Sequence, residues 1–170
     1  LSDLGARVIK IENPSDPDYT RDFAPMMKDG DKEFSGFFAQ YNRNKEAITL
    51  NLKEPEACAI FKQLVKKADV VLENYKAGVV DKRGVGDQDL KSVNPKLVYT
   101  ALSGFGQYGP YSRWPAYDNS AQALSGLWSI NGMPGQPTRM GTIIGDMSAT
   151  MFGAIGLLAA YQHAQKTGQG

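Results

Sequence analysis

The feature that most constrains the fold is an alternation of strand and helix patterns through the middle of the chain. Residues 47–52 alternate in polarity, as a strand does, and Pro55 then opens a helical pattern at the first turn, where proline is tolerated. Apolar residues at positions 57, 60, 61, 64 and 65 give this helix one buried face, and residues 69–73 return to a strand pattern. This strand, helix, strand spacing predicts a βαβ unit.

The rest of the chain continues this alternation of strand and helix patterns. A strand rich in β-branched residues is expected over 6–12, a short helix over 87–93 and a further strand over 96–102. The apolar run of residues 70–72 is typical of a strand covered on both faces. The fold class is therefore predicted to be α/β, a Rossmann-like parallel sheet with helices on both faces and ligands at the carboxyl ends of its strands.

Less regular stretches separate these elements. Residues 15–32 are polar and contain two prolines and Gly30, which predicts an irregular surface excursion. A short amphipathic helix is expected over 34–41. Further on, residues 115–119 are expected to cap an apolar helix over 120–130, and a Gly/Pro-rich turn over 131–136 follows it.

The composition and net charge of the chain limit the classes of function that it could have. With 170 residues, 42% hydrophobic and 22% charged, and a net charge of +1, the chain is expected to be a soluble globular domain, and nucleic acid is not an implied partner. The one cysteine, Cys58, lies in an apolar helical pattern, which excludes a disulfide framework and favours a reduced, cytoplasmic setting. The one histidine, His163, leaves little from which to build a metal cluster or a Ser-His-Asp triad.

Three loops follow predicted strands and are candidates for ligand contacts, namely residues 12–21, 73–78 and 103–110. The last contains the formal pattern Gly-x-Gly-x-x-Gly at Gly104, Gly106 and Gly109. A dinucleotide site requires a helix directly after these glycines, whereas Pro110 and Pro115 interrupt the following residues. We therefore expect a Gly- and aromatic-rich loop that permits close backbone approach.

Asp146 is the candidate catalytic group. It lies in the stretch 141–161, at the head of an otherwise apolar helix and among the small residues Gly145, Ser148 and Ala149. A ligand could approach closely, and the free N–H groups of the first turn favour negative charge, so the carboxylate is a plausible nucleophile. The alternative is that Asp146 is only the helix N-cap, a position that aspartate favours. A membrane span is not expected, because the apolar stretch 147–161 is too short.

Several stretches together resemble one family, the family III CoA-transferases, which includes formyl-CoA transferase and carnitine CoA-transferase. They occur in the family's order and with similar spacing across nearly the whole chain. The matching stretches are 4–14, 42–45, 68–78, 103–110, 116–119, 145–147 and 166–170. The resemblance implies that Asp146 carries first the acyl group and then CoA on its carboxylate. It also implies no permanently bound cofactor, with coenzyme A or acyl-CoA as a substrate.

The resemblance further implies a set of binding residues. Residues matching positions that line the nucleotide and pantetheine of CoA are Leu50, Lys53, Asn74, Tyr75 and Lys82. Asn13 stands where many members have an arginine that contacts phosphate. The expected substrate-binding residues are Phe37, Tyr117 and Asp118. Phe37 replaces a tyrosine that lies near the small acid in formyl-CoA transferase, which argues against copying its oxalate specificity. Asp118 replaces a glutamate that lies near the active aspartate.

The resemblance also bears on what the chain represents. Residues 1–170 match most of the CoA-binding large domain, so we expect the first strand and the C-terminal half, with the small domain, to lie outside them. The family forms interlocked dimers, which implies a homodimer. The expected partners are an acyl-CoA and a small carboxylic acid.

Two other functions stay open at this point. An α-methylacyl-CoA racemase of the same family abstracts an α-proton using an aspartate and a histidine, and Tyr117 stands in the place of that histidine. A non-catalytic CoA- or nucleotide-binding module is the alternative from a different class. Transfer of CoA between acids is the function that the sequence favours.

Overall fold

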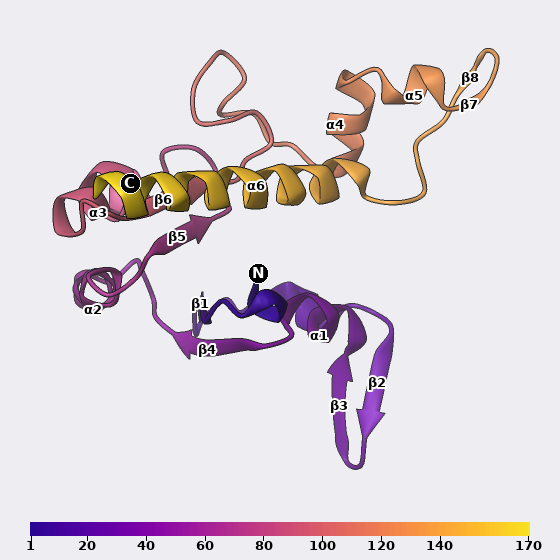
Figure 1. The fold of residues 1–170 in the computed structure, drawn as a ribbon. Helices are drawn as coiled ribbons and strands as arrows, with labels where there is room; N and C mark the ends of the chain where they lie inside the picture. Colours follow the sequence, from indigo (N-terminus) through magenta and orange to yellow (C-terminus); the bar gives the residue numbers. More distant parts are fainter. The chain divides into compact units, whose positions relative to one another are not determined.

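The computed structural model describes residues 1–170 and divides into two compact units, Leu1–Phe61 and Lys62–Gly170 (Figure 1). Each unit contains a parallel strand pair and helices, which confirms the predicted α/β class.

The first unit is organised around the parallel pair of β1 (Val8–Glu12) and β4 (Lys45–Thr49). Its register runs from Val8 opposite Lys45 to Glu12 opposite Thr49. The unit begins with the 3-10 helix η1 (Ser2–Leu4), and α2 (Pro55–Val65) starts within it. Both predicted strands are confirmed, although β4 begins and ends before the expected residues 47–52.

The excursion predicted over residues 15–32 is mostly exposed, as expected, but only its first part is irregular, because residues 26–32 belong to a hairpin. After the 3-10 helix η2 (Tyr19–Asp22), strands β2 (Met26–Asp29) and β3 (Lys32–Ser35) pair antiparallel. Gly30, at φ 59°, starts their two-residue turn in the left-handed region that hairpin turns use. Helix α1 (Gly36–Asn42) follows, and the Ser35 hydroxyl caps it by accepting the Phe38 N–H at 3.0 Å.

The second unit contains the parallel pair of β5 (Val70–Glu73) and β6 (Val98–Ala101), joined through the 3-10 helix η3 (Asp81–Arg83) and α3 (Asp87–Val93). The βαβ unit of the structure is therefore β5–α3–β6. The predicted unit across α2 would join strands of the two units, in which β4 pairs with β1 and β5 pairs with β6, and it stays a prediction. Strand β6 is shorter than the expected 96–102, since Pro95 and Lys96 belong to the turn before it.

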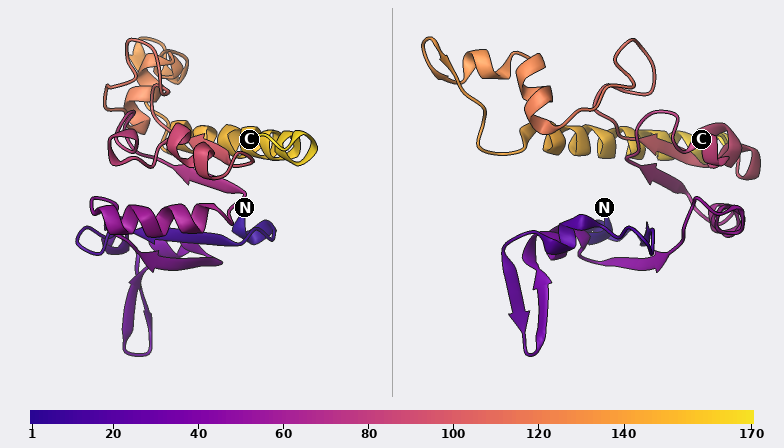
Figure 2. Two further views of the ribbon diagram at one scale, coloured as in Figure 1. Left: turned by 90° about the vertical axis from the view of Figure 1, so that its left-hand side faces the viewer. Right: turned by 180° about the vertical axis from the view of Figure 1, so that it is seen from behind.

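Helix α6 (Ile144–Thr167) runs alongside the β5–β6 pair (Figures 1 and 2). Leu157 and Ala164 are buried against Val98 of β6, with Val70, Ala160 and Tyr161 packed around them. By length and composition this 24-residue helix could cross a membrane, contrary to the expectation from the stretch 147–161, and 6% of its most apolar window is buried in the structure.

Between β6 and α6 the chain forms short elements. The helix expected over 120–130 is two helices, α4 (Asp118–Leu124) and α5 (Leu127–Ile130), because Gly126 adopts a left-handed φ of 80° between them. The expected turn over 131–136 is a small hairpin of β7 (Gly132–Met133) and β8 (Gln136–Pro137). This path carries the chain to the head of α6.

Candidate functional site

The head of α6 presents Asp146 as a free carboxylate. Asp146 is the third residue of the helix, its side chain is exposed, and its carboxylate accepts no hydrogen bond. The helix N-cap is Ile143, without a side-chain cap. The alternative that Asp146 only caps the helix is therefore wrong, and the capping contact comes from another acid.

That acid is Asp118, the first residue of α4. Its Oδ1 accepts the backbone N–H of Gly145 at 2.8 Å, and the residue is buried. Gly145 suits this close contact, because an added Cβ would lie 3.0 Å from Asp118 Oδ1 and 3.2 Å from Ala121 Cβ, and these neighbours would have to shift. Asp118 thus fixes the backbone at Gly145, the residue directly before Asp146. Its predicted contact with the small acid stays a prediction.

Gln122, one helical turn after Asp118, completes this arrangement. It is almost fully buried, and its Nε2 donates to Asp118 Oδ2 at 2.7 Å and to the Thr142 carbonyl at 3.2 Å. Its Oε1 accepts the Met140 N–H at 2.9 Å. The segment entering α6 is therefore held by α4 through three polar contacts. Sequence reasoning missed Gln122; the signal was an Asp and a Gln four residues apart, on one face of a helix expected to be apolar.

The surroundings of Asp146 make its carboxylate more basic than usual. Partial burial raises its pKa above the ordinary value, and the nearby carboxylate of Asp118 raises it further. No basic side chain forms an ion pair with either acid. Tyr117, immediately before α4, is 78% exposed and leaves the neighbourhood open to solvent. A reactive carbonyl carbon could therefore reach the Asp146 oxygens.

A second group of predicted residues follows β5 in the same unit. Asn74, Tyr75 and Lys82 are all exposed, the first two directly after the strand and the third in η3. The Arg83 guanidinium lies 5.5 Å from the centre of the Tyr75 ring. This loop combines an exposed aromatic ring with two neighbouring cations, a combination suited to an aromatic base and phosphates.

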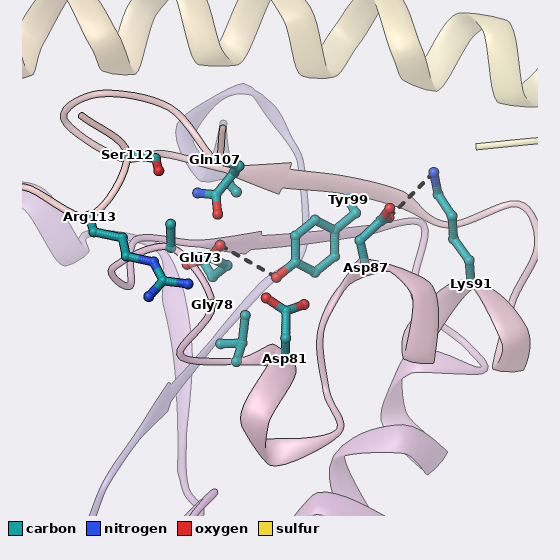
Figure 3. A pocket seen from close by; sticks show the side chains of 12 residues that line it. Glu73, Gly78, Asp81, Asp87, Lys91, Tyr99, Gln107, Ser112 and Arg113 are labelled. Carbon is teal, nitrogen blue, oxygen red and sulfur yellow. Dashed lines mark hydrogen bonds and ion pairs between the residues drawn. The ribbon is translucent and has the colours of Figure 1, made fainter. Parts of the chain in front are cut away.

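A cavity of about 590 Å³ lies behind this loop, at the carboxyl ends of β5 and β6 (Figure 3). Glu73 and the Tyr99 hydroxyl meet inside it at 3.4 Å, and Lys91 pairs with Asp87 at 3.3 Å on its wall. Asn74, Tyr75 and Lys82 are not among its lining residues. The loop therefore has two sides, one exposed with the predicted CoA contacts and one facing this polar cavity.

The glycine-rich loop after β6 contains no helix before Asp118, in agreement with the rejected dinucleotide site. Gly104 lies against Ala116, whose Cβ would be 2.0 Å from an added Cβ. The close approach that Gly104 allows is therefore made by Ala116 of the same chain. Phe105, Tyr111 and Trp114 pack together there, with ring centroids 4.6–6.4 Å apart.

The remaining predicted residues belong to the first unit. Leu50 is half-buried and its N–H donates to the Glu12 carbonyl at 2.9 Å, while Asn13 Oδ1 accepts the Ser15 N–H at 3.1 Å. Leu50 and Asn13 therefore lie at adjoining strand ends, and Lys53 is exposed just beyond them. Phe37 instead packs between Phe23 and Tyr41, with centroid distances of 5.4 and 4.8 Å. Their binding roles stay predictions.

The chain also offers no group of three or more His, Cys, Asp or Glu side chains arranged to hold a metal ion.

Comparisons with known proteins agree on one relationship. The chain is 44% identical to an acetyl-CoA:oxalate CoA-transferase of Acetobacter aceti and 40% identical to a succinate–glutarate CoA-transferase of Agrobacterium fabrum. Each match covers 100% of this chain but only 43% and 44% of the relative, so the chain spans less than half of their length.

Solved structures give the same result. A CAIB/BAIF family protein from Brucella suis superposes with a TM-score of 0.92 at 35% identity, over 99% of this chain and 45% of that one. Rv3272 from Mycobacterium tuberculosis superposes with a TM-score of 0.88 at 32% identity, over 98% and 46%. The family model described as CoA-transferase family III matches residues 1–170 from end to end. The chain therefore belongs to CoA-transferase family III.

Proposed function

We propose that the full-length protein moves CoA from an acyl-CoA to a free carboxylic acid, and that Asp146 is its covalent nucleophile. The observation that carries this proposal is the state of Asp146, an exposed carboxylate without hydrogen bonds on a backbone fixed by Asp118. A carboxylate kept free at a rigid helix head is suited to attack.

The proposed reaction balances without a metal or a redox group. A carboxylate oxygen of Asp146 attacks the thioester carbonyl, and the C–S bond breaks to release CoA thiolate and leave a mixed anhydride. The thiolate attacks the aspartyl carbonyl, which gives an aspartyl-CoA thioester and the free donor acid. The acceptor carboxylate then repeats both steps in reverse order, so that acyl-CoA leaves and Asp146 is regenerated.

The loop after β5 is proposed to hold CoA. The Tyr75 ring and the Lys82 and Arg83 cations offer an aromatic surface and positive charge to a nucleotide with phosphates. Asn74, Leu50, Lys53 and Asn13 are proposed to add contacts, in line with the family resemblance. We propose Phe37, Tyr117 and Asp118 as residues near the small acid.

The acids themselves are proposed as a class only. The two curated relatives described above are named for oxalate, succinate and glutarate, and these small dicarboxylates are the first acceptors to test. We further propose that residues 1–170 are most of the CoA-binding large domain of a cytoplasmic homodimer. The large apolar side chains exposed along α6, among them Met151, Phe152 and Ile155, support a larger assembly. Light scattering of the full-length protein tests its oligomeric state.

The decisive experiment follows the α-hydrogen and the CoA group together. Full-length protein is incubated in deuterium oxide with a 2-methylacyl-CoA and an isotopically labelled dicarboxylic acid, and the products are identified by mass spectrometry. We expect the labelled acid to appear as its CoA ester while the α-hydrogen is retained. Rapid α-deuteration without transfer would favour the racemase. Binding of CoA with neither reaction would favour a non-catalytic module.

A further inference from the structure

The side chain of Glu73 joins the cavity of the second unit to the loop that follows β5. Glu73 is the last residue of β5, and its carbonyl accepts the Leu102 N–H at 2.9 Å, which fixes its backbone to the end of β6. Its side chain turns back under the loop, where Oε2 accepts the backbone N–H of Tyr75 at 2.5 Å. One carboxylate therefore pins the first turn of the loop.

The other carboxylate oxygen is held from the neighbouring strand. The Tyr99 hydroxyl of β6 donates to Glu73 Oε1 at 3.4 Å, and Figure 3 shows the two side chains meeting inside the cavity. The contact is long, so it directs the carboxylate more than it stabilises it. Asp81 of η3 is the other charged group that acts on Glu73, and no cation pairs with it.

We propose that Glu73 is a positioning residue for CoA, which holds Asn74 and Tyr75 in their binding conformation through the Tyr75 N–H. This inference rests on the proposed function, because it assumes that the loop binds CoA. Tyr75 is 42% exposed, so little packing holds its ring. A backbone bond to a strand-anchored carboxylate would fix the loop before the ligand arrives and reduce the ordering cost of binding.

The test uses variants of the full-length protein. Glu73→Leu removes both acceptors at similar size, and we expect the Kd for CoA to rise about tenfold, the typical effect of one lost hydrogen bond to a charged group. The kcat/KM for acyl-CoA should fall by the same factor, while kcat at saturation and kcat/KM for the acceptor acid stay near wild type. A fall of kcat alone would overturn the inference.

Conservative and matched variants separate positioning from general stability. Glu73→Gln keeps one oxygen for the Tyr75 N–H and should bind CoA within about threefold of wild type, and Tyr99→Phe should do the same, because its contact is long. Asp87→Asn alters an acid of α3 on the same cavity that has no bond to the loop, and it should leave binding unchanged. Equal losses in Glu73→Leu and Asp87→Asn would overturn the inference.

Hydrogen exchange tests the contact without any variant, should Glu73→Leu not fold. The Tyr75 amide should exchange several-fold more slowly than that of Lys76, which lies next in the loop and has no acceptor. Equal exchange would overturn the inference. If wild-type protein neither binds CoA nor transfers it, the proposed function fails; if it does both while Glu73→Leu behaves as wild type, only this inference fails.

Discussion

Two glutamates close parallel strands in equivalent ways, Glu12 at the end of β1 and Glu73 at the end of β5. Each carbonyl accepts an N–H from the residue following the paired strand, Leu50 in one unit and Leu102 in the other, at 2.9 Å. Their side chains then differ. Glu12 is buried beside Arg21 and Lys10, whereas Glu73 has a tyrosine hydroxyl and one backbone N–H as its partners.

The pKa values of the two acids move in opposite directions as a result. Hydrogen bonds from Arg21 hold the pKa of Glu12 at about 2, with the Asp18 N–H and Lys10 adding to the effect. Burial raises the pKa of Glu73, because no cation offsets it and Asp81 adds negative charge. Pairing with cations thus gives Glu12 a stabilising role in the first unit. Two acids of the second unit that have no cation partner, Glu73 and Asp146, lie where ligands are proposed to bind.

The largest predicted effect concerns Asp146, the acid whose carboxylate has neither a hydrogen bond nor an ion pair. Asp146→Asn should lower turnover by about 1000-fold or more, roughly 4 kcal/mol of barrier, because an amide cannot attack the thioester. The Kd for CoA should change little. Steady-state rates and calorimetry check both, with Asp69→Asn as an exposed control. If Asp146→Asn kept a tenth of the activity, the absence of a partner at Asp146 would not indicate a catalytic role.

The next effect concerns Asp118, which has no cation either but is fully engaged. Asp118→Ala leaves the Gly145 N–H and Gln122 without their acceptor, and it should lower turnover by about 10- to 100-fold by releasing the backbone at Asp146. Gln122→Ala should produce part of this loss, and the double variant should be no worse than Asp118→Ala. Additive losses in turnover would mean that the two residues act separately.

Sequence patterns predicted the elements whose signals are local. The helix over 87–93 was predicted with the bounds that the structure has, because a periodic segment lies between clear turns. The hairpin before Ser35 was missed because its strands are short and mostly polar, and Gly30 was interpreted as a loop signal. Strand pairing could not be predicted in detail, since pairing is a long-range property that spacing alone does not encode.

The candidate site shows the same limit. Asp146 could be singled out from its own neighbours in the sequence, namely small residues at a helix start. The contact that fixes it spans 27 positions, from Asp118 to Gly145. Only the family resemblance indicated that Asp118 lies near the active aspartate, and it did not indicate this backbone contact. Gln122 carried no signal beyond its spacing from Asp118. Burial, which makes these contacts matter, becomes visible only in the folded chain.

A smaller effect tests the first unit. Glu12→Gln should lower the stability of the full-length protein at pH 7 by about 1–2 kcal/mol, reduced by the partial exposure of Arg21. Because folding lowers the pKa of Glu12, its contribution is present above about pH 4.5 and is lost as the pH falls toward 2. Melting curves between pH 7 and 3 check this. Turnover below the melting temperature should stay near wild type, since Glu12 is not proposed to bind a ligand.

The smallest predicted effect concerns Glu73, whose contribution to folding stability changes with pH in the opposite direction to that of Glu12. Folding raises the pKa of Glu73, so the folded state binds its proton more tightly than the unfolded state does, and stability falls as the pH rises from about 4.5 through the folded-state value. The Tyr75 N–H and the Tyr99 hydroxyl oppose this shift, which keeps the effect small. Glu73→Gln cannot ionise, so its melting temperature relative to wild type should increase across that interval. The melting temperature of Glu12→Gln relative to wild type should instead decrease as the pH rises from about 2 to 4.5, where Glu12 ionises. If the melting-temperature differences of both variants changed in the same direction with pH, the presence or absence of cation partners would not explain the contrast between Glu12 and Glu73.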